Sequence, residues 1–141
     1  MRNNLISAVL VLFVTIMVFQ SCQDEDSITF KLYYVNGKGL YEKKCQSCHG
    51  IDGKGLGTLY PPLTDTTFLQ TNRNKLACMI RKGMSGPITI NNISYDGKMP
   101  GDENIADIDL AQVITYINNS FGNTQGLYDL KSLEADLKAC K

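Results

Sequence analysis

Three residues with reactive side chains stand together in the stretch CQSCHG, at positions 45–50. Cys45 and Cys48 form a C-x-x-C pair, and His49, the single histidine of the chain, follows at once. Such a pair can be a dithiol redox site, half of a zinc site or, when histidine follows directly, a covalent attachment point for haem c. Only the haem interpretation uses all three residues.

The spacing suits haem attachment. Two thiols separated by two residues lie about one helical turn apart, where both can add to the vinyl groups on one side of a porphyrin. His49 then offers one ring nitrogen to the iron as proximal ligand, while the other donates to a backbone carbonyl. A zinc site would need Cys78 and Cys140 to complete four ligands, and the strand-helix alternation of a thioredoxin-like site is missing. We therefore expect one covalently bound haem c.

The distal ligand of the iron cannot be a second imidazole, and methionine thioether is the usual alternative. Met79 belongs to a helical apolar stripe, which indicates a core position. Met99 lies in the loop DGKMPG, where Pro100 restricts the backbone and no helical or strand period accounts for the side chain. We predict Met99 as the distal ligand. Met84 is the second candidate, and an open or Lys98-ligated iron is the remaining alternative.

Four segments in order carry a wider similarity: GKGLYEKKCQSCHGIDGKG, YPPL, GKMP and DIDLAQVITYINNSFG. Over residues 35–141 the chain resembles single-haem class I c-type cytochromes of bacteria. The resemblance implies a mostly α cytochrome c fold, with about four to five helices around the covalently bound haem. It also implies Met99 as the distal ligand and the Pro61 carbonyl as acceptor of the His49 ring proton, with Pro62 as the alternative acceptor.

Two helices are expected to cross beside the haem. Asn36 is a suitable N-cap for a helix that runs to about residue 48. Glycine inside a helix costs about 1 kcal/mol relative to alanine, so Gly37 indicates close approach by another helix. The partner helix begins at Asp107 and has one apolar face, and the family resemblance suggests Tyr116 at the crossing.

A short β-hairpin is expected before the distal methionine. Two runs with alternating apolar residues, 88–90 and 93–95, flank the pair Asn91-Asn92, which suits a two-residue hairpin turn. Tyr95 ends the second run. We interpret it either as a hydrogen-bond donor near a haem propionate or as a half-exposed aromatic.

Cys78 and Cys140 remain after the haem motif is assigned. Leftover cysteines of an exported protein tend to pair, and both lie on apolar helix stripes, the second on a last helix that starts near Ser132. We expect a disulfide between them. The alternative is two buried thiols that behave as small hydrophobes.

The N-terminal end reads as an export signal. Residues 1–21 start with a basic residue and contain an uncharged run that is shorter than the roughly 20 residues of a membrane-spanning helix; an uncleaved anchor is the alternative. The stretch VFQSC resembles a bacterial lipoprotein box, although Phe19 and Gln20 depart from its pattern. The resemblance implies cleavage before Cys22 and lipidation of its thiol, a lasting membrane anchor. The alternative is a soluble exported protein with a stray cysteine.

We divide the chain accordingly into a signal peptide of the lipoprotein type (1–21), an acidic flexible tether (22–34) and one cytochrome c domain (35–141). The expected location is the periplasmic side of a membrane, with the lipoprotein anchored at Cys22.

Charge is balanced over the whole chain but not along it. Residues 31–98 carry ten Lys/Arg and four Asp/Glu, whereas residues 99–141 carry three and seven. A basic rim around the haem, steering the domain to acidic redox partners, is one interpretation, and an ordinary solvated surface is the other. The near-neutral charge argues against nucleic acid as a partner.

The function that follows is electron transfer without catalysis. No second histidine is present to act as acid or base, and both axial positions of the iron are filled, so no small-molecule substrate is expected. The alternatives are a haem subunit docked to an oxidoreductase, and a peroxide- or gas-reactive haem protein with a labile distal ligand.

Overall fold

The computed structural model describes the following residues: 6–7, 10–13, 15 and 24–140. The chain divides into two compact units, Met1–Lys31 and Leu32–Lys141. Cys22 and most of the signal expected at 1–21 lie outside the described residues. Within the part of the chain that is described, no helix has both the length and the apolar character needed to cross a membrane.

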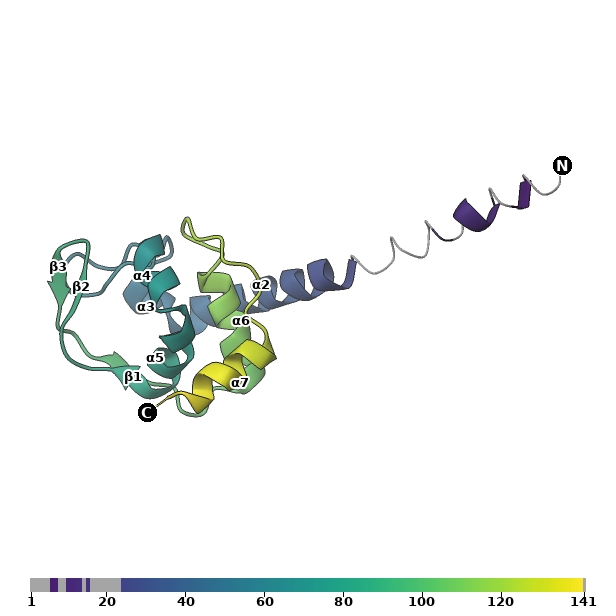
Figure 1. Ribbon diagram of the computed structural model, residues 1–141. Helices are drawn as coiled ribbons and strands as arrows, with labels where there is room; N and C mark the ends of the chain where they lie inside the picture. Colours follow the sequence, from purple (N-terminus) through teal and green to yellow (C-terminus); the bar gives the residue numbers. More distant parts are fainter. Residues whose placement is uncertain (1–5, 8–9, 14, 16–23, 141) are drawn as a thin grey trace. The chain divides into compact units, whose positions relative to one another are not determined.

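The first long helix, α2 (Asp24–Lys44), leads directly into the C-x-x-C motif (Figure 1). It begins well before Asn36, so the expected N-cap at Asn36 is wrong, and the segment interpreted as a flexible tether is helical from Asp24 on. No glycine or proline precedes Gly37 in this helix, so nothing interrupts it. The acidic residues that indicated a tether lie in its first turn, where negative charge favours a helix.

Helix α6 (Asp107–Ile117) crosses α2 at Gly37, as the sequence predicted. A Cβ atom on Gly37 would overlap the Gln112 carbonyl and the Cβ of Tyr116, so only glycine fits there. The rings of Tyr41 and Tyr116 lie beside this contact, with centroids 5.3 Å apart. The predicted crossing, with Tyr116 in it, is confirmed.

Helix α6 also packs against two further helices of the core. Helix α5 (Leu76–Lys82) packs against both α6 and α7 (Leu130–Lys138), and α6 packs against α7 (Figure 1). Helix α7 begins two residues before the expected Ser132, because the Asp129 carboxylate caps it by accepting a hydrogen bond from the Ser132 N–H at 2.8 Å.

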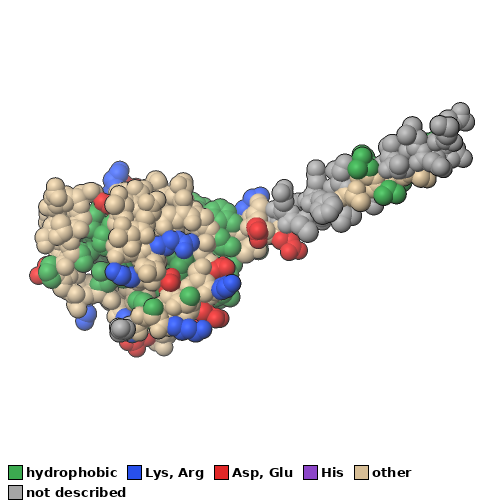
Figure 2. All heavy atoms as spheres, viewed as in Figure 1, with side chains coloured by type: hydrophobic (Ala, Val, Ile, Leu, Met, Phe, Trp, Pro, Cys, Tyr) green, Lys and Arg blue, Asp and Glu red, His purple; other side chains and the backbone are tan. Residues whose placement is uncertain are grey.

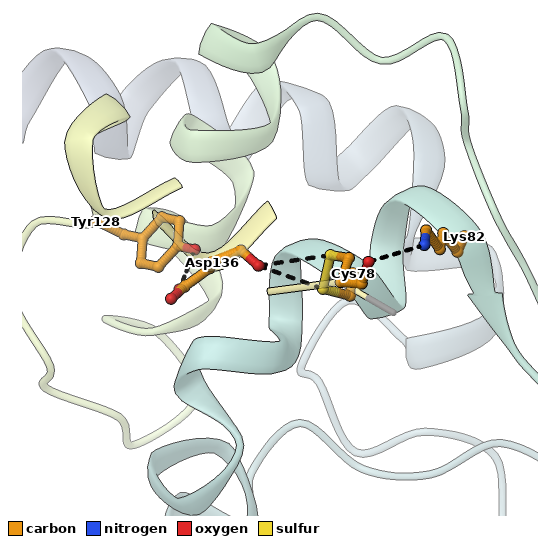
Figure 3. Close-up of a disulfide and its surroundings, with 5 residues drawn as sticks. Cys78, Lys82, Tyr128 and Asp136 are labelled. Atoms are coloured by element: carbon orange, nitrogen blue, oxygen red, sulfur yellow. Dashed lines mark hydrogen bonds between the residues drawn. A yellow bond between two sulfur atoms is a disulfide. The ribbon is translucent and has the colours of Figure 1, made fainter. Parts of the chain in front are cut away.

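A disulfide joins Cys78 of α5 to Cys140, just after α7, with the two Cα atoms 5.7 Å apart. Figure 3 shows it beside a second tie within the C-terminal segment, the hydrogen bond from the Tyr128 hydroxyl to the Asp136 carboxylate at 2.6 Å. Lys82, at the end of α5, also donates to the Cys140 carbonyl. The disulfide and the Lys82 hydrogen bond attach the C-terminus to α5.

The strands of the described residues form two small antiparallel sheets. β2 (Ile88–Ile90) pairs with β3 (Ile93–Tyr95) through a two-residue turn. Asn91 and Asn92 in this turn have φ angles of 51° and 61°, both positive as a type I′ turn requires, so the predicted hairpin is confirmed.

The other sheet was not predicted. β1 (Gly83–Met84) continues from α5 and pairs with β4 (Met99–Pro100), so that Met84 lies opposite Met99. Strands of two residues are too short to show a period-two pattern, and their pairing spans a long sequence separation.

The remaining helices are short. α3 (Gln46–His49) is a single turn, and α4 (Thr66–Thr71) leads through the 3-10 turn η2 (Arg73–Lys75) to α5. Helix α4 starts where the Asp65 carboxylate accepts from the Phe68 N–H at 2.7 Å. We did not predict α4, because one and a half turns carry too few apolar residues for a stripe.

An ion pair ties the end of α2 to the loop after β4. Lys44 Nζ lies 2.7 Å from a carboxylate oxygen of Asp102. The hydrogen bond between them lowers the pKa of Asp102 and raises that of Lys44. The pKa of Asp102 is lower in the folded than in the unfolded state. The ion pair therefore stabilises the fold above the unfolded pKa of about 3.9, and this stabilisation is lost as the pH falls below that value and through the folded pKa.

From the crossing of α2 and α6 we predict opposite changes in stability for alanine at Gly37 and at Gly39, the two glycines of α2. Gly37→Ala should lower the free energy of unfolding by about 1–3 kcal/mol, because the new methyl group must displace the Gln112 carbonyl or Tyr116. At Gly39 nothing lies within 4 Å of a Cβ position, so Gly39→Ala should raise the free energy of unfolding by roughly 0.5–1 kcal/mol. Urea unfolding measures both, and equal effects would contradict the close crossing.

The ion pair predicts a pH-dependent stability difference. Asp102→Asn should lower the melting temperature modestly at neutral pH, and the difference from the wild type should shrink as the pH falls below about 4. Thermal melts of both proteins across this range measure it. A difference that persists unchanged in acid would show that Asp102 acts through packing rather than charge.

Candidate haem site

Cys45, Cys48 and His49 share one helical turn at the end of α2. The Cys45 carbonyl accepts hydrogen bonds from the N–H groups of Cys48 at 3.1 Å and of His49 at 3.0 Å. The turn is closed from the other side, because the Tyr41 hydroxyl donates to the Gly50 carbonyl at 2.6 Å. Burial raises the pKa of Tyr41, so this hydroxyl keeps the proton that it donates.

An aromatic cluster backs this turn. The rings of Tyr34, Tyr41, Tyr116 and Phe121 form a chain of contacts with centroids between 5.2 and 5.7 Å apart. Aromatic pairs at such distances contribute about 0.5–1.5 kcal/mol each beyond the area that they bury. The cluster therefore holds the C-x-x-C-H turn against α6.

The His49 ring is oriented by the loop that follows. Its Nδ1 lies 3.0 Å from the Pro61 carbonyl oxygen, which is the contact that the family resemblance implied for Pro61. With Nδ1 engaged in this way, Nε2 is the nitrogen left for a metal ion. Burial lowers the pKa of His49, opposed by the Pro61 hydrogen bond, and so favours the neutral imidazole that metal ions bind.

Two adjoining hollows open beside His49, and we name them after the thiol that lines each. The Cys48 hollow and the Cys45 hollow have volumes of about 510 and 660 Å³, part of which is open to solvent. Both hollows are lined by the following residues: His49, Pro61, Met84, Ile88 and Met99.

The walls of the Cys45 hollow are almost entirely apolar. Helix α5 contributes Met79 and Ile80, and α6 contributes Ile114 and Ile117. Burial also raises the pKa of the Cys45 thiol to about 11, so the unattached thiol is uncharged. Two adjoining hollows, each lined by one thiol and both lined by one imidazole and apolar side chains, match the chemistry of haem c.

The predicted residues of the distal half meet at these hollows. Met99 lies in β4 and lines both. Tyr95 lines the Cys48 hollow together with Lys98 and is only 4% exposed, so its interpretation as a half-exposed aromatic is wrong. Met79 packs against the core as expected.

The side chains that could bind zinc do not support the zinc alternative. Cys78 and Cys140 are joined to each other and cannot complete a site at Cys45 and Cys48. Among the described residues, no group of three or more His, Cys, Asp or Glu side chains is placed to hold a metal ion by itself.

Some lining residues were missed by sequence reasoning. Leu59 and Tyr60 lie in the glycine-rich loop, where no periodicity singles out a side chain, and they line the Cys48 hollow. Phe68 reaches the Cys45 hollow from the unpredicted α4. Ile88 and Ile90 had a usable signal, the strand alternation of the hairpin.

Comparisons with known proteins agree with this geometry. The family model Cytochrome c matches residues 34–121. Cytochrome c-552 of Thermus thermophilus is 24% identical over 109 residues, which cover 74% of this chain and 73% of that protein.

Two further relatives are subunits of larger complexes. The fructose dehydrogenase cytochrome subunit of Gluconobacter japonicus is 33% identical over 94 residues, 64% of this chain and 19% of that subunit. The alcohol dehydrogenase (quinone) cytochrome c subunit of Gluconacetobacter polyoxogenes is 32% identical over 92 residues, 63% of this chain and 19% of that subunit. With the matched segment spanning the C-x-x-C-H turn, both hollows and α6, this chain belongs to the cytochrome c family, whose members bind haem c covalently and transfer electrons.

Proposed function

We propose that this chain carries electrons through one haem c attached at Cys45 and Cys48, with His49 and Met99 as axial ligands. The observation that carries the proposal is that His49 and Met99 line the same two hollows, each of which is also lined by one of the thiols. When bound, haem c supplies one-electron exchange at its iron.

The residues around the hollows serve this role without acid-base chemistry. Among the described residues that line them, none is Asp or Glu, and His49 Nδ1 is engaged by Pro61. The side chains that α5 and α6 contribute give the Cys45 hollow an apolar lining, and thioether ligation by Met99 would raise the reduction potential relative to a second imidazole. These features support a carrier rather than a peroxide- or gas-reactive protein.

We further propose an exported, membrane-anchored location. The support is the sequence of residues 1–21 and the lipoprotein-like box before Cys22. Acyl chains on Cys22 would hold the domain at the periplasmic side of a membrane, within reach of membrane-bound redox proteins.

Docking is proposed at an apolar patch of the loop beside the Cys48 hollow. Leu56 and Leu59 are 59% and 55% exposed, and the Leu59 N–H donates to the Leu56 carbonyl at 2.9 Å, so we call these two residues the loop patch. Leu59 lines the Cys48 hollow together with Lys98. The patch therefore offers an apolar contact with one positive charge at its edge, which suits a partner with an apolar surface and acidic residues around it.

The basic rim expected from the sequence is weakened by local ion pairs. Lys38, Lys44, Lys54 and Arg81 each lie within 4 Å of an acidic side chain. On the face seen in Figure 2, blue and red side chains are interspersed over the domain. We therefore propose that apolar contact contributes more to docking than long-range charge.

A docked haem subunit is a second candidate. The dehydrogenase cytochrome subunits that resemble this chain favour it, although the chain spans 19% of their length. Both candidates use the same haem site and the same loop patch. They differ in whether the partner is bound permanently.

The ligand assignment is tested with the full chain produced with haem. Haem should survive acid extraction in the wild type and be lost in a Cys45→Ala/Cys48→Ala variant. Met99→Ala should change the proton NMR shift of the ligand methyl group in the ferrous protein and shift the reduction potential. If shift, potential and carbon monoxide reactivity all stay at wild-type values, Met99 is not the distal ligand.

The loop patch is tested by electron self-exchange between ferrous and ferric copies, measured from NMR line broadening. Leu59→Lys should slow the exchange by about tenfold, because like charges would face each other across the contact. Val35→Lys, at another exposed apolar residue that lines neither hollow, is the matched control. Equal slowing in both variants would place docking elsewhere.

A further inference from the structure

The β1–β4 ladder sets a second thioether beside Met99. Met84 lies directly opposite Met99 in the antiparallel pairing. Side chains of directly opposed residues project from the same face, with Cβ atoms about 4.5–5.5 Å apart. Both methionines are partly buried, and both line the Cys45 and Cys48 hollows. The two sulfurs therefore belong to one wall of the site.

The backbone of this wall has little freedom. A Cβ on Gly83 would lie 2.5 Å from the Met99 carbonyl oxygen, and a Cβ on Gly101 would lie 2.7 Å from the Arg81 carbonyl oxygen. Since the strands pass each other without room for a methyl group, we expect each methionine to keep its place when the other side chain is removed. Removal of one methionine side chain also leaves free space on the strand face that Met84 and Met99 share.

Met84 is the more firmly anchored of the two. It follows α5 without an intervening loop, and α5 is joined to the C-terminus by the Cys78–Cys140 disulfide. Arg81, three residues earlier, donates to the Ile105 carbonyl at 3.0 Å and pairs with the Asp107 carboxylate at 2.7 Å. Met99, by contrast, follows the exposed residues 96–98 and is held in place by its pairing with β1.

We propose that Met84 is a reserve distal ligand, whose thioether takes the iron's distal position when that of Met99 is absent. This inference rests on the proposed function, in which His49 and Met99 are the axial ligands. The competing interpretation is that Met84 only fills space, as methionines often do in irregular cores. The two differ in what happens at the iron once the Met99 side chain is removed.

The experiment compares Met99→Ala, Met84→Leu and the double variant in the full haem-loaded chain, with Met79→Leu as a control at another methionine that lines the Cys45 hollow. Methionine labelled with carbon-13 at the methyl group reports ligation, because the ring current of ferrous haem shifts the methyl of a coordinated methionine, held directly over the ring, much further upfield than that of a methionine that only lines the hollow. In Met99→Ala we expect one new upfield methyl signal and slow carbon monoxide binding. The new methyl signal and the slow carbon monoxide binding should be lost only in the double variant. Met84→Leu and Met79→Leu should each keep the strongly upfield signal of the Met99 methyl group.

Two outcomes would overturn the proposal, and they are distinguishable. If Met99→Ala has no upfield methyl signal and binds carbon monoxide as fast as the double variant, Met84 is filler, although ligation by Met99 stands. If the wild-type signal disappears in Met84→Leu and persists in Met99→Ala, the ligand assignment of the proposed function fails as well. Met99→Val, which favours a strand and cannot ligate, repeats the test should the alanine variant not fold.

Discussion

The close crossing of α2 and α6 at Gly37 is the contact on which the site depends. Glycine inside a helix costs about 1 kcal/mol relative to alanine, and here the cost is offset by the aromatic contacts that the crossing brings together. The same crossing positions two parts of the site on the His49 side. Helix α2 ends at the C-x-x-C-H turn, and α6 lends Ile114 and Ile117 to the wall of the Cys45 hollow.

The distal half of the site is built from the other end of the core. Helix α5 packs on α6 and α7, is closed by the disulfide to Cys140, and runs straight into β1. The pairing of β1 with β4 then places Met99 without a long element of its own. The ion pair between Lys44 and Asp102 joins this half to the end of α2. The Cys45 and Cys48 hollows therefore lie between the C-x-x-C-H turn and the β1–β4 pair. These two parts are connected through α6 and through the Lys44–Asp102 ion pair.

The features that could be read from the sequence are those whose cause is local. The C-x-x-C-H spacing places the three candidate haem-binding residues on one turn, the pair Asn91-Asn92 closes a hairpin because both residues tolerate positive φ, and Gly37 marks a close contact. The errors also have local causes. The start of α2 is polar and acidic, which is also typical of a tether, yet it has no helix breaker before Gly37, and α4 is too short to show a period.

The sequence by itself determined the chemistry of this protein: two thiols, one imidazole and no second histidine allow haem c and require a different distal ligand. It also named Met99 and Met84 as candidates for that ligand. Only the tertiary structure decided that these two methionines stand opposite each other at one wall, that Tyr95 is buried and that Pro61 rather than Pro62 contacts His49. The reason is that spacing along the chain dictates contacts within a turn, whereas pairing between distant segments depends on how the helices pack.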